Sequence, residues 1–345
     1  MPSIRRLPTG KIPPHWLKEM IFKKLGSPSD RLILGPKIGE DAAIIDMGNR
    51  VIVVKADPIT GAVENIGRFV VHINANDIAS CGVRPLWFIC VVMLPEGSNE
   101  ATLRKIVCDM DEALKEIKVT LISGHTEVTP KLERPILVGC MIGEASKDGY
   151  LTTSGARDGD ALIMTKTAGI EGTAILANDL YEHLKEGVDE EHLNSAKSFL
   201  DRISVVPEAM IAVSIGGVHS MHDPTEGGIL NGVWEMAEAA DKGVIIDERL
   251  ISIADETQLI CSRLGIDPLK LLGSGSLLIS ADPKKASEIC NALNGASIKA
   301  SIIGWIRPRR EDRYLLLKNG ERSRIDSVEQ DHLYKVLDEY GVDRN

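Results

Sequence analysis

A short acidic stretch, residues 39–57, constrains the fold of this 345-residue chain more than any other feature. Two apolar, β-branched runs lie on either side of Gly48, a pattern typical of a tight β-hairpin. Such a hairpin places Asp41 or Glu40 opposite Asp57, within one residue of register. Because opposed side chains in antiparallel strands lie about 5 Å apart, like charges there repel. The pattern predicts either a cation between these carboxylates or two solvated acids at the open end of the hairpin.

The composition is that of an ordinary globular protein, with 43% hydrophobic and 26% charged residues, and the length predicts two domains or one large one. A formal net charge of −10 argues against nucleic-acid binding. No apolar run approaches the roughly 20 residues of a membrane-spanning helix, and the N-terminus lacks a signal-peptide core. We therefore expect a cytoplasmic protein without a membrane segment. The six cysteines form no C-x-x-C pair, which favours buried thiols over disulfides or zinc.

The N-terminal segment, residues 1–15, is rich in proline, glycine and basic side chains and is expected to form an extended arm. Lys11 in this arm is either a solvated lysine or a group that closes over phosphates. Residues 16–25 have the pattern of a short amphipathic helix.

A longer helix is predicted between Gly67 and Gly82, because apolar residues recur there at helical spacing. The same face carries Asn74 and Asp77. A polar pair on a packed face must be hydrogen-bonded or must bind something. We expect Asp77 to bind a ligand or a metal, and the alternative is a buried structural network.

The rest of the first half is predicted to give the order β-β-α-β-α-β-β. Its further elements are a strand at 86–94, a helix capped by Ser98 or Asn99, a short buried strand at 119–122 and a strand at 136–142. The buried strand runs into the polar segment 123–127, and such segments commonly carry ligand groups. His125 in this segment is expected to be hydrogen-bonded or solvated rather than metal-bound.

The first half therefore places four carboxylates at strand ends and on one helix: Asp41, Asp57, Asp77 and Glu127. Carboxylate oxygens suit Mg²⁺, which commonly bridges to nucleotide phosphates. The chain contains no G-x-x-x-x-G-K-[ST] motif. If ATP binds, we expect carboxylate-bound Mg²⁺ and backbone groups to hold it.

The second half is expected to be an α/β domain that follows a linker at 143–159. A strand at 160–166 leads into a glycine-rich turn that opens a helix, a geometry that can present backbone N–H groups to an anion. Further on, the pattern predicts a glycine turn into a strand near 272–280, a helix at 283–293, a hairpin at 319–320 and a terminal amphipathic helix from 328 to 340.

A capping box is predicted in the second half, with Asp223 as N-cap, Pro224 at the first helical position and Glu226 three residues after the cap. Gly227 and Gly228 then fall inside the first helical turn, where each glycine costs about 1 kcal/mol. Their presence indicates that another segment approaches the backbone closely.

Five motifs, in this order and at these intervals, resemble the aminoimidazole-ribonucleotide synthase (PurM-like) superfamily. They are GEDAAII at 39–45, AD at 56–57, NANDIASCGVRP at 74–85, SGHTE at 123–127 and HDPTEGG at 222–228. The superfamily includes thiamine-monophosphate kinase, selenophosphate synthetase and the hydrogenase-maturation protein HypE. The second half of the chain makes it most similar to the HypE branch.

The resemblance implies a two-domain PurM-like α/β fold with an α+β N-terminal half. Its parts would be an arm and helix (1–35), an N-terminal ATP- and Mg²⁺-binding and dimerisation domain (36–150), and a C-terminal α/β domain (151–345). It also implies a homodimer whose N-terminal strands join in a shared β-barrel, with ATP and Mg²⁺ near the interface.

Matched motif by motif, the resemblance implies that Asp41, Asp57 and Asp77 hold the Mg²⁺. The implied nucleotide-binding positions add Glu40, Asn74, Gly124, Thr126 and Glu127 to these three. The groups expected to act in catalysis are Lys11, Asp77, Glu127 and Asp223.

The function implied is that of an ATP- and Mg²⁺-dependent enzyme that phosphorylates an oxygen of a small molecule or carrier group, in hydrogenase maturation. HypE proteins end in a tail whose last cysteine carries the carbamoyl group. This chain ends in GVDRN, and its last cysteine, Cys290, falls in the helix predicted at 283–293, so dehydration by that route is not expected. The alternatives are a kinase resembling thiamine-monophosphate kinase and a non-catalytic nucleotide-binding accessory protein. The expected partner is accordingly a small-molecule substrate or a maturation protein.

Overall fold

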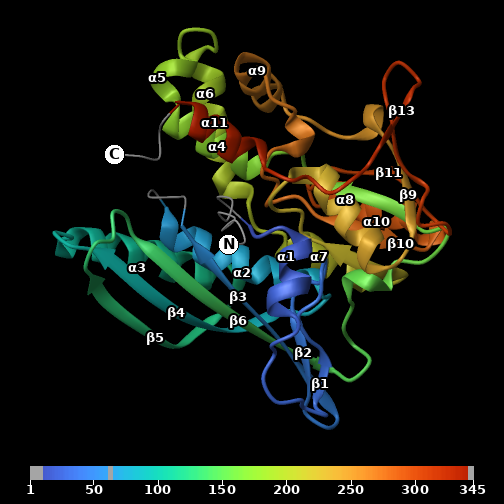
Figure 1. Ribbon diagram of the computed structural model, residues 1–345, viewed down its shortest axis with the longest axis horizontal. Coiled ribbons are helices and arrows are strands. Elements are labelled where there is room, and N and C mark those ends of the chain that lie inside the picture. The colour runs from blue at the N-terminus through green and yellow to red at the C-terminus, as the bar shows by residue number, and fades with distance from the viewer. Residues whose placement is uncertain (1–10, 61–64, 341–345) are drawn as a thin grey trace, which may run out of the picture.

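The chain forms two β-sheets with helices around them, and the computed structural model describes residues 11–60 and 65–340. The first sheet has the order β1-β2-β3-β6-β4-β5 and the second the order β13-β12-β9-β11-β7-β10-β8. In Figure 1 the first sheet lies below helix α2 (Ile66–Ser80), and the second sheet lies above it to one side. A mixed α/β architecture in two parts is therefore confirmed.

The first half contains the predicted alternation, preceded by one short strand that the sequence did not indicate. Its strands are β1 (Leu32–Leu34), β2 (Ala43–Asp46), β3 (Arg50–Ile59), β4 (Pro85–Pro95), β5 (Thr120–Thr129) and β6 (Ile136–Ser146), and α3 (Glu100–Ile117) joins β4 to β5. The predicted helix at 16–25 is shorter and starts earlier, as α1 (Pro14–Trp16) and a π-helical turn (Leu17–Ile21). The part of the predicted arm at 1–10 lies outside the described residues.

Within the described residues, the second half has seven strands, which form one sheet. They are β7 (Ala161–Thr165), β8 (Val218–His222), β9 (Gly243–Asp247), β10 (Leu278–Ala281), β11 (Ala300–Arg307), β12 (Arg313–Leu316) and β13 (Arg322–Arg324). The α-helices are α4 (Ile170–Asp179), α5 (Tyr181–Leu184), α6 (Glu190–Lys197), α7 (Val206–Ile215), α8 (Gly228–Ala239), α9 (Asp255–Leu264), α10 (Pro283–Gly295) and α11 (His332–Tyr340). None of the described helices is both long and apolar enough to cross a membrane.

The acidic hairpin is confirmed as β2 and β3, which pair from Ala43 opposite Val54 to Asp46 opposite Val51. Gly48 has a φ of +97°, a conformation that glycine adopts without strain, and its N–H donates to Asp46 Oδ1 at 2.7 Å. Val51 and other inward-facing apolar residues of the two strands are fully buried. The hydrophobic alternation therefore fixes the register of the hairpin, with Asp57 inside β3 and Asp41 two residues before β2.

Helix α2 is buried along almost its whole length, and one hydrophobic core surrounds it. That core joins strands of the first sheet to α7, α10 and strands of the second sheet. The side chain of Asn76 on α2 bonds to the second half directly, donating to Ile203 O (2.9 Å) and accepting from Val205 N (2.8 Å). Polar residues on α2 are thus held between the two halves of the chain.

The prediction of a short buried strand at 119–122, with the polar segment 123–127 after its end, is wrong. Residues 123–127 continue β5, which pairs in parallel with β4 and forms the edge of the sheet (Figure 1). Apolar side chains that indicated burial are exposed instead, with Leu121 46%, Ile122 51% and Val128 55% accessible. An edge strand has no neighbour on one side, so its apolar pattern alone does not show what covers it.

The predicted capping box is also wrong, because α8 begins at Gly228 with Gly227 as its N-cap, four residues after Asp223. Both glycines have positive φ, +79° and +62°. A Cβ on Gly228 would lie 2.5 Å from Leu271 O. The close backbone approach predicted from these glycines is therefore confirmed, and it prevents the helix from starting earlier.

Candidate functional site

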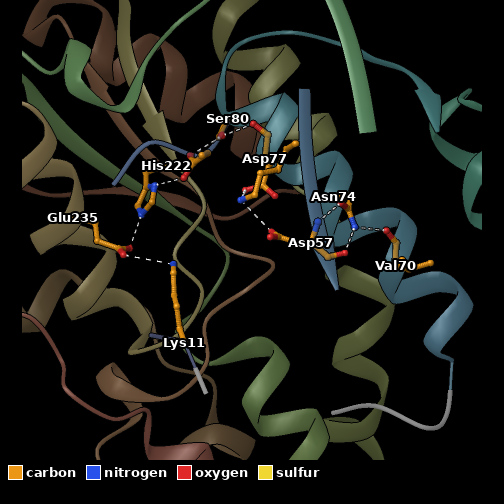
Figure 2. A network of polar contacts seen from close by, with 10 residues as sticks. Lys11, Asp57, Val70, Asn74, Asp77, Ser80, His222 and Glu235 are labelled. Carbon is orange, nitrogen blue, oxygen red and sulfur yellow. Dashed lines mark hydrogen bonds and ion pairs between the residues drawn. The ribbon is translucent and has the colours of Figure 1, made fainter. Parts of the chain in front are cut away.

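Strand β3 and helix α2 carry Asp57 and Asp77, and the side chain of Asn74 joins these two elements. Asn74 Oδ1 accepts from Asp57 N at 2.8 Å, while its Nδ2 donates to Asp57 O at 3.2 Å and to Val70 O at 2.9 Å (Figure 2). A Cβ on Gly139 would lie 2.4 Å from this amide nitrogen, so glycine is required for the contact. Asn74 therefore positions the strand that carries Asp57.

The ammonium of Lys55 lies between the two aspartates. Lys55 Nζ is 3.1 Å from Asp57 Oδ2 and 3.4 Å from Asp77 Oδ1. Burial lowers the pKa of Lys55, but the carboxylates of Asp77 and Asp57 outweigh it and hold this pKa above its usual value. Lys55 thus bridges Asp57 to Asp77. A cation between Asp57 and Asp41 or Glu40, as the hairpin pattern indicated, stays a prediction.

His222, the last residue of β8, is buried between Asp41 and Glu235. Its Nδ1 lies 2.7 Å from Asp41 Oδ1, an ion-pair contact without the alignment of a hydrogen bond, and its Nε2 lies 3.0 Å from Glu235 Oε2. Burial lowers the pKa of His222, but the two carboxylates outweigh burial and raise it to about 10. The ring is therefore an imidazolium at neutral pH. Asp41 Oδ2 also accepts from Ser80 Oγ at 2.7 Å, and Figure 2 shows Ser80, His222 and Glu235.

Lys11 lies at the edge of this arrangement, with Nζ 3.7 Å from Glu235 Oε1 and about half of its side chain exposed. The carboxylate of Glu235 holds the pKa of Lys11 above its usual value. Burial raises the pKa of Glu235, but Lys11 and His222 overcome this effect and lower it to about 2. Lys11 is thus neither free in solvent nor buried, and its ammonium faces the acids.

Four buried carboxylate oxygens have no hydrogen-bond partner among the described residues: Oδ2 of Asp77, both oxygens of Asp223 and, on α7, Oε2 of Glu208. Asn76 is a polar neighbour of Asp223, but its amide bonds to backbone groups instead. Burial raises the pKa of Asp77 well above its usual value, with Lys55 acting in the opposite direction. Burial and the charge of Asp41 do the same to the pKa of Asp223. Such oxygens are costly unless a ligand satisfies them.

Asp41, Asp57, Asp77, Asp223 and Glu235 are referred to below as the carboxylate cluster. Oxygens of this kind fit Mg²⁺, which prefers carboxylate ligands. Within residues 11–60 and 65–340, however, no three acidic, histidine or cysteine side chains are already arranged as a metal-binding group. The assignment of Asp41, Asp57 and Asp77 as the metal ligands therefore stays a prediction.

The other predicted site residues lie apart from the cluster. Glu40 accepts hydrogen bonds from Thr153 N (2.9 Å) and Ser154 N (3.1 Å), so its carboxylate is bonded to the segment that links the two sheets. Gly124, Thr126 and Glu127 lie on β5, which β6 and β4 separate from β3. The carboxylate of Glu127 contacts His125 Nε2 (3.1 Å) and accepts from Thr129 Oγ1 (2.8 Å). His125 is therefore hydrogen-bonded, as predicted.

Three charged members of the site were not predicted: Lys55, His222 and Glu235. Lys55 precedes Asp57 by two residues, so the period of a strand places both on one face, and this signal was present. His222 is adjacent to Asp223 in a quoted motif. Glu235 lies on α8, and only the tertiary packing of α8 against β8 brings it to His222.

Models of the AIR synthase related protein family match the chain in two blocks: the N-terminal domain over residues 39–145 and the C-terminal domain over residues 157–315. The chain belongs to this family. The PurM-like resemblance predicted from the motifs is thereby confirmed.

Among curated family relatives, a putative hydrogenase expression/formation protein from Methanocaldococcus jannaschii is 32% identical over 303 residues, which are 86% of this chain and 88% of the relative. Carbamoyl dehydratase HypE from Cupriavidus necator is 30% identical over 233 residues, 67% of this chain and 64% of that protein.

Solved structures with the same fold include HypE proteins and a thiamine-monophosphate kinase. A HypE–HypF complex gives a TM-score of 0.75 at 21% identity, covering 91% of this chain and 99% of the other. The structure of HypE in complex with ATP gives a TM-score of 0.69 at 22% identity and covers 95% of this chain and 98% of the other. The structure of the kinase ThiL in complex with AMPPCP and TMP gives a TM-score of 0.69 at 18% identity and covers 91% of this chain and 94% of the other.

Proposed function

We propose that this protein is a Mg²⁺-dependent, ATP-using enzyme of the HypE type, which activates an oxygen atom of a small molecule or carrier group by phosphorylation. The observation that carries the proposal is the set of unpaired, buried oxygens of Asp77 and Asp223 beside the cationic side chains of Lys55, His222 and Lys11. Buried acids without hydrogen-bond partners destabilise the fold, and a bound cation would offset that cost.

In this proposal Asp57, Asp77 and Asp41 would hold Mg²⁺, and the metal would supply positive charge against the negative charge of the transferred phosphoryl group. Asn74 fixes the backbone of Asp57, and Ser80 and His222 orient Asp41. Asp57 and Asp41 are thus positioned by second groups, so that binding at these two carboxylates requires little rearrangement.

Lys11 would contact the nucleotide phosphates from the exposed side of the cluster. Its ammonium already faces Glu235 and keeps about half of its surface accessible. Asp223, with two free oxygens, would bind either the metal or the acceptor group.

Similar proteins support this proposal and define the alternative to it. Relatives of this chain are called carbamoyl dehydratase HypE, and one HypE structure holds ATP. A HypE-type role in hydrogenase maturation is therefore the first candidate. The ThiL structure with AMPPCP and TMP favours a small-molecule kinase as the second. Cys290 lies buried in α10, where burial raises its thiol pKa, so packing rather than carriage of a carbamoyl group suits this cysteine.

The exposed apolar residues of β5 support a homodimer in which this edge pairs with a second copy. Such a dimer would bring Gly124, Thr126 and Glu127 to the interface, where the family resemblance implies that ATP lies. The HypE–HypF structure supports a maturation protein as a further partner.

Release of ADP tests the function most broadly. Purified protein is given Mg-ATP with a panel of small metabolites and carbamoyl donors, and ADP, free phosphate and phosphorylated product are measured. A dehydratase yields ADP and free phosphate, whereas a kinase yields ADP and a phosphorylated metabolite. Tight ATP binding without turnover on any substrate would reject the enzyme and favour a nucleotide-binding accessory protein.

A further inference from the structure

The ammonium of Lys55 lies in the carboxylate cluster at a position where a metal ion could otherwise bind. Its Nζ lies 3.1 Å from Asp57 Oδ2 and 3.4 Å from Asp77 Oδ1. These lengths suit an ammonium, whereas Mg²⁺ requires oxygens at about 2.0–2.1 Å. Because Asn74 bonds to the backbone of Asp57, the strand is held where this bridge forms.

The ammonium of Lys55 contacts both Asp57 and Asp77. Without it, Asp57 Oδ2 and Asp77 Oδ1 would each lose this cationic partner, and a cation taken up from solvent could bind between them.

The unpaired oxygens indicate where one metal ion would bind. Asp77 directs Oδ1 to Lys55 but leaves Oδ2 without a partner, and both oxygens of Asp223 are also unpaired. The cluster therefore has a side already occupied by an ammonium and a side that is left for an ion.

We propose that the Lys55 ammonium stands in place of one divalent cation, so that the protein takes up one metal ion fewer than the same chain with a neutral residue at position 55. The inference rests on the proposed function for the identity of the cluster as a metal site. The inference adds that Lys55 determines how many metal ions the carboxylate cluster binds.

The test counts Mn²⁺ bound to the full-length protein without nucleotide, from the electron paramagnetic resonance signal of free Mn²⁺. Wild type is compared with Lys55→Met and Lys55→Gln, and with the double variant Lys55→Met/Asp57→Asn. Lys147→Met is the matched control, because Lys147 pairs with Asp46 at 3.0 Å at the other end of the same hairpin. We expect one ion in wild type and in Lys147→Met, two in the Lys55 variants, and one again in the double variant.

A second measurement follows the ATP affinity as a function of Mg²⁺ concentration. The slope of log affinity against log Mg²⁺ should rise by one in Lys55→Met, so that a tenfold drop in Mg²⁺ costs the variant an additional tenfold in affinity. Equal ion counts in wild type and the folded Lys55 variants would overturn the inference. If neither variant folds, two Mn²⁺ ions bound to wild type would overturn it as well, and one would support it.

Failure of this inference can be distinguished from failure of the proposed function. Wild type that binds Mn²⁺ but shows no ATP binding would reject the proposed function, while the ion counts would still decide the role of Lys55. Wild type that binds Mg-ATP, with equal counts in the variants, would reject only the role of Lys55.

Discussion

Two regions of the molecule bury aspartates to a similar degree, but they treat the carboxylate oxygens differently. Asp160, just before β7, is 2% exposed and fully bonded. Its Oδ2 accepts from Ser280 Oγ (2.6 Å) and Arg157 N (2.9 Å), and its Oδ1 lies 2.9 Å from His219 Nδ1. This carboxylate holds together a strand, a loop and a neighbouring strand, and nothing remains for a ligand to satisfy.

In the carboxylate cluster, Asp77 and Asp223 are 5% and 2% exposed, yet three of their four oxygens have no partner. Burial of an acid therefore does not distinguish a structural network from a binding site. What distinguishes them is whether the surrounding chain satisfies the acid. The difference predicts that substitutions at Asp160 change stability, whereas substitutions in the cluster change binding.

The largest effect expected from this comparison is a loss of stability in the variant Asp160→Ala. The substitution leaves Ser280, His219 and the Arg157 N–H without their acceptor, and losing one partner of a buried charged network costs about 3–5 kcal/mol. Urea denaturation should show this loss in the free energy of unfolding. Asp160→Asn, which keeps one acceptor oxygen, is the control and should lose less. A loss below about 1 kcal/mol in the alanine variant would show that the network is not structural.

A third buried acid, Asp331, extends the comparison because its raised pKa makes the stability of the protein depend on pH. It accepts from the N–H groups of Gly227 (2.6 Å), Leu272 (3.2 Å) and Leu333 (2.7 Å), yet burial outweighs these bonds and raises its pKa to about 7. Between the ordinary carboxyl pKa near 4 and this value, the folded state keeps a proton that the unfolded state has released. Stability should therefore fall as pH rises through this window.

The measurement for Asp331 is the free energy of unfolding at pH 5 and pH 8. Wild type should lose about 2–3 kcal/mol more than Asp331→Asn over this interval, because the amide does not titrate. The same pH dependence in both proteins would place the titrating group elsewhere.

The smallest effect on stability is expected at Asp223. Because its oxygens bond to nothing in the described chain, Asp223→Asn should change the free energy of unfolding by less than about 1 kcal/mol. The same substitution should weaken Mg-ATP binding at least tenfold, measured by calorimetry. A large loss of stability without a change in binding would move Asp223 into the structural class with Asp160.

Local patterns in the sequence were sufficient for the parts of the fold that depend on neighbouring residues. The β2–β3 hairpin follows from alternation around Gly48, and α2 follows from the helical period between Gly67 and Gly82. Family motifs were sufficient for the overall architecture. The predicted cap at Asp223 was wrong because Gly227 and Gly228 both have positive φ, and Gly228 packs closely against the backbone of Leu269 and Leu271, more than forty residues away.

The candidate site was only partly predictable, because its charges come from both halves of the chain. The sequence indicated Asp57 and Asp77, but not that Lys55 would bridge them. Glu235 has no motif of its own and reaches His222 only through the packing of α8. For β5, an apolar strand at a sheet edge reads like a buried one, since sequence does not show which neighbour is missing.

The central claim is that the unsatisfied acids of the cluster bind Mg²⁺ together with ATP, and calorimetric titration of ATP into Asp77→Asn tests it most directly. Wild type should bind ATP with Mg²⁺ present and lose binding when EDTA removes the metal. Asp77→Asn should weaken Mg-ATP binding at least a hundredfold, about 3 kcal/mol, without a lower melting temperature. Asp46→Asn, at a partly exposed aspartate of the same hairpin, should bind as wild type does. Unchanged Mg-ATP affinity in a folded Asp77→Asn protein would contradict the account.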